Sequence, residues 1–175
     1  MKRAMSWAML VAGAALTISA APAMPATAAT SGGETLSGTL VFAAEPGAST
    51  RTVIGSVVVA KGALGSVGRF VELVPGDPVS QDDLVFPGGT LHVVSTLGSL
   101  SSFSINPHSC MFTGTQPLTW QVTGGTGQFT GATGSLTGTV SGRALFARNP
   151  DGSCSFAPFA LHEVDKFEES GTLSF

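Results

Sequence analysis

An alternation of apolar and polar residues with a period of two is the feature that most constrains this chain. In segment 135–146, Val140 and Phe146 share one face with other apolar and glycine residues, while serine, threonine and arginine occupy the other face. The same pattern recurs around Leu40 and around Trp120. Successive side chains of a β-strand point to opposite faces, so this pattern predicts strands with one face in a core and one in water.

Runs of this kind recur after residue 33, and glycine, proline, asparagine and aspartate separate them. Only 11% of the residues are charged and no helical apolar stripe follows the N-terminal region, which disfavours helical bundles and coiled coils. Small and large residues alternate on the apolar faces, as in a tightly curved barrel. We therefore predict an all-β fold, a single antiparallel eight-stranded β-barrel. Its strands are expected at residues 34–43, 52–60, 68–74, 90–96, 100–105, 118–123, 134–148 and 161–175.

The first 29 residues have the character of a secretory signal peptide. Lys2 and Arg3 precede an apolar run at residues 4–18, and an alanine- and proline-rich stretch follows. We predict a signal peptide at 1–29, one barrel domain at 30–175, and a secreted, extracellular mature protein. No later segment is apolar enough to span a bilayer, so no membrane anchor is expected after cleavage.

The charge balance narrows the classes of partner. The full chain has a net charge of −3, and loss of the two basic residues of the signal peptide leaves six basic against eleven acidic residues. An acidic chain is a poor match for nucleic acid and for anionic membranes. The sequence does not specify an oligomeric state.

Cys110 and Cys154 are the only two cysteines. In a chain bound for an oxidising compartment, a disulfide between them is the first expectation. The alternative, a thiolate nucleophile or metal ligand, needs a nearby base or further ligands, and only His108 is close in sequence.

Histidines and acidic residues show no spacing typical of metal ligands. Asp82-Asp83 is interpreted as part of a turn, and the three histidines are scattered along the chain. We expect no metal and no cofactor.

A glycine-rich stretch at residues 122–134 is the most distinctive local motif. A dinucleotide-binding fingerprint would need a third glycine at position 130 and a following helix, and a P-loop would need a lysine after the glycines. The stretch therefore predicts a tight connection between two strands, with Phe129 in the core. Its glycines with an expected structural role are Gly124, Gly125, Gly127, Gly131 and Gly134.

The run Gly124-Gly125-Thr126-Gly127, followed by Phe129, Gly131-Ala132 and Gly134, resembles the signature of allene oxide cyclase barrels and plant dirigent proteins. It is most similar to small secreted bacterial proteins with an allene oxide cyclase-like barrel. In those proteins one cysteine typically precedes the glycine motif and another follows the next strand, as Cys110 and Cys154 do here.

The resemblance covers roughly residues 105–175 and implies an eight-stranded antiparallel barrel. In the cyclases of this fold, the barrel holds an apolar substrate. Most of the secreted relatives have no assigned activity, so the resemblance implies little about chemistry. None of the family's polar pocket residues aligns with a particular position of this chain.

The last predicted strand holds two candidate catalytic residues, Glu163 and Asp165. If Phe167 and Leu173 face inward in one unbroken register, both carboxylates face inward with them. Burial would raise the pKa of one of them into a range suited to acid–base chemistry. One alternative is a bulge or bend near Glu163, because a slip of one residue returns both groups to water, and another is a position at the barrel mouth.

The interior decides the function, because an eight-stranded barrel is either filled by its own side chains or holds one small ligand. We expect a non-enzymatic binding module for a small apolar molecule. One alternative is a cofactor-independent cyclase or isomerase that uses the two carboxylates of the last strand. Another is a solid barrel that acts through its threonine- and serine-rich outer face as a structural or surface interaction protein. The expected ligand-binding wall consists of Phe42, Trp120, Val140 and Phe146.

Overall fold

The computed structural model describes residues 30–156 and 159–175, so the predicted signal peptide lies outside the described residues. The described chain is almost entirely β-strand, with one short 3-10 helix, η1 (Gly127–Phe129). No helix in this part of the chain is long and apolar enough to cross a membrane. The strands are β1 (Ser31–Ala43), β2 (Thr52–Gly62), β3 (Val67–Val74), β4 (Val79–Phe86), β5 (Gly89–Leu97), β6 (Ser102–Asn106), β7 (Met111–Gly125), β8 (Thr133–Leu145), β9 (Ala147–Arg148), β10 (Cys154–Ser155) and β11 (His162–Ser174).

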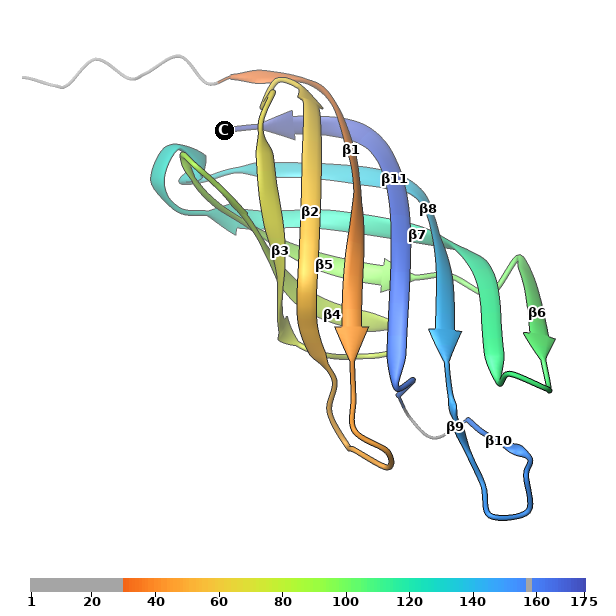
Figure 1. The fold of residues 1–175 in the computed structure, drawn as a ribbon. Coiled ribbons are helices and arrows are strands. Elements are labelled where there is room, and N and C mark those ends of the chain that lie inside the picture. The colour runs from red at the N-terminus through yellow and green to blue at the C-terminus, as the bar shows by residue number, and fades with distance from the viewer. Residues whose placement is uncertain (1–29, 157–158) are drawn as a thin grey trace, which may run out of the picture.

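Eight of these strands close into one antiparallel barrel (Figure 1). The order is β5-β4-β3-β2-β1-β11-β8-β7, and β7 pairs back onto β5. The first and last strands pair from Ser31 opposite Ser174 to Ala43 opposite His162, which removes the free edges that an open sheet would expose. The predicted all-β, eight-stranded antiparallel barrel is confirmed.

A short extension continues from the lower end of the barrel in Figure 1, which carries the β1–β2 loop. There β7 and β8 run past the barrel, and β6 pairs with β7 on the outside. The disulfide Cys110–Cys154 joins the start of β7 to β10, with a Cα–Cα distance of 5.3 Å. The predicted disulfide is therefore confirmed.

Two details of the predicted strands are wrong. The strand expected at 100–105 is β6, which flanks the barrel, and β4 takes its place in the wall. The turn expected at Asp82-Asp83 is the middle of β4, where Asp82 faces inward and Asp83 outward. Asp82 is tolerated inside because the hydroxyls of Ser80 and Ser95 donate hydrogen bonds to its carboxylate.

The predicted alternation is confirmed in β8, where Leu136, Val140 and Ala144 are buried and the residues at odd positions from 135 to 143 are exposed. The inward apolar residues of the barrel form one continuous core. In its middle, the rings of Trp120 and Phe167 lie 4.9 Å apart between centroids. The middle of the barrel is therefore packed with the protein's own side chains.

The glycine-rich connection between β7 and β8 closes the upper end. Phe129 is fully buried, as predicted, and its ring lies 6.1 Å from Phe86 and 5.1 Å from Phe175 between centroids. Gly127 and Gly131 have φ angles of 61° and 80°, a left-handed backbone that glycine adopts readily. An aromatic plug therefore fills part of this end, and Glu34 and Glu169 are also buried in the upper half of the barrel. The start of β11, with Glu163 and Asp165, lies at the other end.

Candidate functional site

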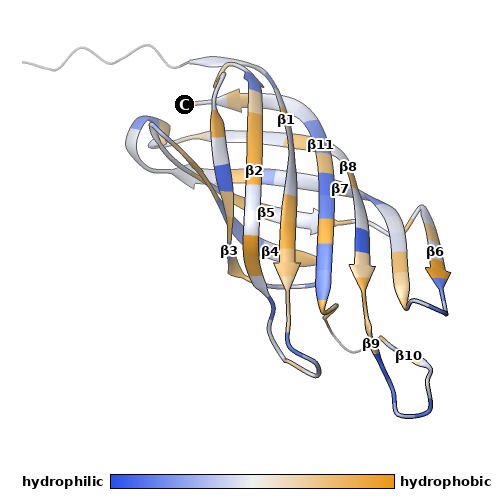
Figure 2. Cartoon of the chain, in the orientation of Figure 1, coloured by the Kyte–Doolittle hydropathy of each residue, from blue (hydrophilic) through white to orange (hydrophobic). Residues whose placement is uncertain are grey.

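The lower end of the barrel combines apolar walls with acidic groups. Figure 2 shows hydrophilic residues at the start of β11, next to the apolar lower parts of β1 and β2. Glu163 and Asp165 lie near the start of β11, which keeps an unbroken register with both β1 and β8. The bulge considered near Glu163 is therefore wrong, and both carboxylates lie on the inward face with Phe167.

Asp165 lies on the inner wall opposite a glycine. Its partner on β8 is Gly142, and a Cβ atom at that glycine would meet Asp165 Oδ1 at 2.5 Å. Any larger residue would displace the carboxyl group. The missing side chain at position 142 thus provides the room that Asp165 occupies.

A β-bulge in β2 turns Arg51 into the barrel. Val41 pairs with Gly55 but Phe42 pairs with Val53, so Ile54 is the extra residue of β2. A bulge reverses the alternation beyond it, which brings Val53 and then Arg51 onto the inward face. Ile54 is correspondingly exposed at 58%.

The guanidinium of Arg51 joins opposite sides of this end of the barrel. Nη2 donates to Glu72 Oε1 at 2.8 Å, and Nη1 donates to Glu163 Oε2 at 3.1 Å. The guanidinium also stacks over Phe42, with 4.0 Å from Cζ to the ring centroid. Arg51 thus links β3 to β11 through charge-assisted hydrogen bonds while lying on an aromatic surface.

The acidic groups around Arg51 outnumber its single charge. Burial raises the pKa of Glu163, although the charge of Arg51 acts in the opposite direction. Burial, together with the nearby charge of Glu163, raises the pKa of Asp165 to about 7. Near neutral pH the pair therefore offers one carboxyl that holds a proton part of the time, beside one hydrogen-bonded to a cation.

Asp82 on β4 adds a fourth carboxyl to those of Glu72, Glu163 and Asp165, and we call these four residues the acidic cluster. It pairs with Glu72 across the sheet, so both carboxyls share the inward face. Ser80 Oγ donates to Asp82 Oδ2 at 2.8 Å, and Ser95 Oγ donates to the same oxygen. Burial raises the pKa of Asp82 to about 6, while the two hydroxyls act in the opposite direction.

The barrel wall is open on one side of this cluster. β2 and β3 share only two residue pairs, Val58 with Gly68 and Val59 with Val67. Below them, Ser56 Oγ bridges the gap by accepting from Phe70 N–H and donating to Phe70 C=O, both at 3.0 Å. A pocket of about 510 Å³ occupies this gap.

Residues from the barrel interior form part of this pocket, which we call the side pocket. Arg51, Phe70 and Glu72 line it from within, and Ile54 and Arg69 border it towards solvent. Its volume lies in the range of small-molecule sites. A small molecule in the side pocket would therefore lie next to the guanidinium of Arg51 and the ring of Phe70.

The four expected ligand-binding residues do not form one wall. Trp120 and Val140 lie in the packed core, and Phe42 lies in the core beneath Arg51. Phe146 follows the end of β8 and packs on Phe112 and Phe156 in the extension. Of the four, Phe42 contacts Arg51 and is the register partner of Glu163.

Sequence reasoning missed Arg51, Glu72, Asp82 and the deeply buried Glu169. Glu169 could have been found, because it has the same parity as Phe167 in β11 and is only 1% exposed. Arg51 lies 21 residues from Glu72 and 112 from Glu163, so no local pattern indicates their contact.

Among the described residues, no group of three or more histidine, cysteine, aspartate or glutamate side chains is arranged to hold a metal ion. The similarity to allene oxide cyclase-like and dirigent barrels stays a prediction. No family model, no curated protein and no solved structure matches this chain.

Proposed function

We propose that this protein is a secreted binding module for a small, largely apolar molecule that carries one polar group, and that it binds this molecule at the side pocket. The observation that carries the proposal is the gap between β2 and β3, where the partly exposed Arg51 and the largely buried Phe70 line the side pocket. Its lining mixes apolar side chains such as Ile54 and Val71 with the charged Arg51 and Glu72, so it suits a ligand with both an apolar and a polar part.

The packing of the barrel supports this location over its middle. Trp120, Leu136 and Val58 are at most 1% exposed and belong to one continuous core. A ligand in the middle would have to displace these side chains. At the side pocket it would contact Phe70 and place its polar group near Arg51, whose side chain is 21% exposed.

Secretion is supported by the predicted signal peptide and by the disulfide between Cys110 and Cys154. Disulfides persist mainly in oxidising compartments. Secretion is tested by the N-terminal sequence of the protein in the culture medium, which we expect to begin near residue 30.

Native mass spectrometry tests binding directly. We expect protein purified from its own medium to carry an adduct that organic extraction removes. The stripped protein should then take up a member of a panel containing a medium-chain fatty acid, a terpene alcohol and a naphthalene derivative.

A matched pair of variants locates the site. Val71→Trp places a large ring in the side pocket, which Val71 lines, and should abolish the adduct. Val57→Trp adds the same ring at an exposed position of β2 outside the side pocket, so uptake should be unchanged. Equal uptake by folded Val71→Trp and by the parent protein would refute the location.

A second candidate function is a cofactor-independent cyclase or isomerase on the same barrel. The observation that favours it is the pair Glu163 and Asp165, whose environments differ because Arg51 binds only the former. A carboxyl whose pKa is raised by burial, beside one that is hydrogen-bonded to a cation, is suited to acid–base chemistry.

Glu163→Gln combined with Asp165→Asn should abolish turnover of any substrate that the adduct identifies, while the fold is kept. Glu168→Gln, an exposed change on the same strand, should leave turnover unaffected. Unchanged product formation by the double variant would eliminate the enzyme hypothesis and leave the binding hypothesis standing.

A further inference from the structure

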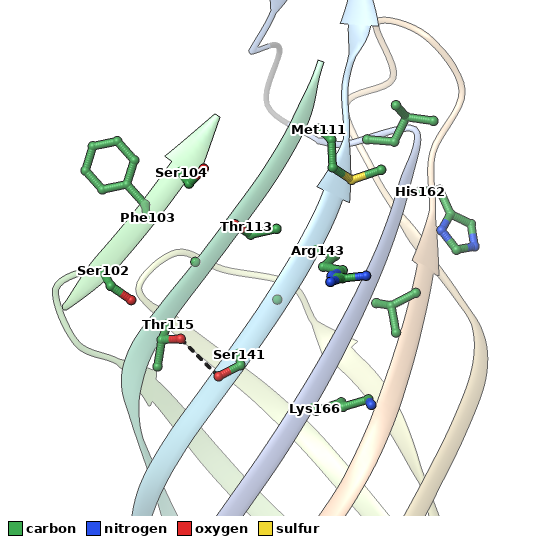
Figure 3. A pocket seen from close by; sticks show the side chains of 14 residues that line it. Ser102, Phe103, Ser104, Met111, Thr113, Thr115, Ser141, Arg143, His162 and Lys166 are labelled. Carbon is green, nitrogen blue, oxygen red and sulfur yellow. Dashed lines mark hydrogen bonds between the residues drawn. The ribbon is translucent and has the colours of Figure 1, made fainter. Parts of the chain in front are cut away.

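The outer surface of the barrel carries a second, larger depression. It has a volume of about 900 Å³ and lies across the outward faces of β6, β7, β8 and β11 (Figure 3). We call it the outer groove. It is separate from the side pocket, because the two share no residue.

The strand register arranges the outer groove in rows. One row runs Ser104, Thr113, Arg143 and Val164, and the next runs Ser102, Thr115, Ser141 and Lys166. Arg143 and Lys166 are therefore diagonal neighbours on adjacent strands, roughly 7–8 Å apart at the backbone.

Hydroxyl groups make up the β6 and β7 side of the outer groove. Figure 3 shows Thr115 and Ser141 joined by a hydrogen bond, with an oxygen–oxygen distance of 3.0 Å. Each hydroxyl can both donate and accept a hydrogen bond. Five such groups line the groove: Ser102, Ser104, Thr113, Thr115 and Ser141.

The charge of the outer groove is positive. Arg143 and Lys166 line it together with His162, and no aspartate or glutamate does. Neither cation forms an ion pair within the described residues. The nearest acidic residue on the same face of β11 is Glu168, two positions from Lys166.

The net negative charge of the chain does not oppose an anionic partner at this face. Six of the eleven acidic side chains lie inside the barrel or at its lower end, and burial keeps several of them partly protonated near neutral pH. These six are Glu34, Glu72, Asp82, Glu163, Asp165 and Glu169.

We propose that the outer groove binds an acidic polysaccharide. Arg143 and Lys166 would pair with carboxylate or sulfate groups of neighbouring sugars, and the serine and threonine hydroxyls would exchange hydrogen bonds with sugar hydroxyls. Met111, Leu145 and Val164 offer aliphatic surface to the C–H faces of the rings.

A nucleic acid fits the outer groove less well. Base stacking needs aromatic rings, and Phe103, the single aromatic residue lining the groove apart from His162, points away from the neighbouring serines. Its register partner is Gly114, on the opposite face of β7 from Thr113 and Thr115.

Titration calorimetry with short oligogalacturonates and with heparin fragments tests the proposal, with neutral dextran and single-stranded DNA as comparisons. Oligogalacturonates present carboxylates, and heparin fragments also present sulfates. We expect the protein to bind at least one of these two glycans and to bind DNA and dextran more weakly. Arg143→Gln and Lys166→Gln should each weaken binding about tenfold, the usual effect of removing one charge-assisted hydrogen bond.

The matched control is Lys61→Gln. It removes the same single charge from an exposed position that lines neither pocket, and it should change the affinity less than about twofold. Equal weakening by Lys61→Gln and by the two groove variants would overturn the proposal, because the effect would then be one of overall charge. Equal binding of DNA, or no binding of either glycan at low salt, would also overturn it.

Discussion

Glu169 is expected to make the protein less stable as the pH rises. Its carboxyl is 1% exposed, and neither oxygen has a hydrogen-bond partner. Burial raises the pKa of Glu169 from 4.5 to about 8. Between these values the unfolded chain releases a proton that the folded chain retains, so the free energy of unfolding falls with rising pH.

The size of the effect follows from the two pKa values. The ionisation of Glu169 should favour the unfolded state by about 1 kcal/mol at pH 5 and by about 4 kcal/mol at pH 8. Glu169→Gln removes this ionisation and keeps a similar shape. When the pH rises from 5 to 8, the free energy of unfolding of the variant should therefore increase by about 3 kcal/mol relative to that of the parent protein.

Urea denaturation at the two pH values measures this gain. Trp120, the single tryptophan of the barrel domain, reports unfolding by fluorescence because it is buried. Glu168→Gln is the control, since it makes the same change of charge at an exposed neighbour and should show no such gain. Parallel pH dependence of Glu169→Gln and the parent protein would refute the reasoning.

Three further changes test the fold. Replacing Cys110 and Cys154 by serine should lower the free energy of unfolding by about 4 kcal/mol, measured in urea, because the unfolded chain regains the freedom of the closed loop. Gly38→Ala should lower the free energy of unfolding by at least about 2 kcal/mol, because the added Cβ would lie 2.1 Å from the backbone oxygen of Val57 and 2.7 Å from the ring of Phe167. Gly33→Ala is the control: its Cβ meets open space, so it should have little effect in the same assay. Arg51→Met should lower the free energy of unfolding by about 3 kcal/mol at neutral pH, because it leaves the carboxylates of Glu72 and Glu163 buried without a partner. The loss should be smaller at pH 4, where these carboxyls are more protonated, and an equal loss at both pH values would contradict the prediction.

Period-two alternation carried the prediction of the barrel because each strand has one buried face. In β11 the same alternation correctly places Glu163 and Asp165 inside, given an unbroken register. The register holds because both neighbouring strands pair along its length, so a slip would expose Phe167 and Leu173. The burial of Glu169 follows from the same alternation, because Glu169 has the same parity as Phe167.

Other parts of the site depend on contacts that no local pattern shows. The bulge at Ile54 decides whether Arg51 points inward, and the residues around it have no distinctive sequence. β4 was missed because two aspartates between proline- and glycine-rich turns are typical of a loop. Asp82 is accommodated by Ser95, a hydroxyl 13 residues away on the next strand.

The two ends of the barrel differ in the polar groups that they hold. The upper end is filled by Phe86, Phe129 and Phe175, and it contributes to stability through packing. The lower end keeps an arginine and several carboxyls where apolar residues of similar volume would fold at least as well. Under the proposed function the arginine at the lower end binds the polar group of the ligand, so variants at the lower end should change ligand uptake before those at the upper end do.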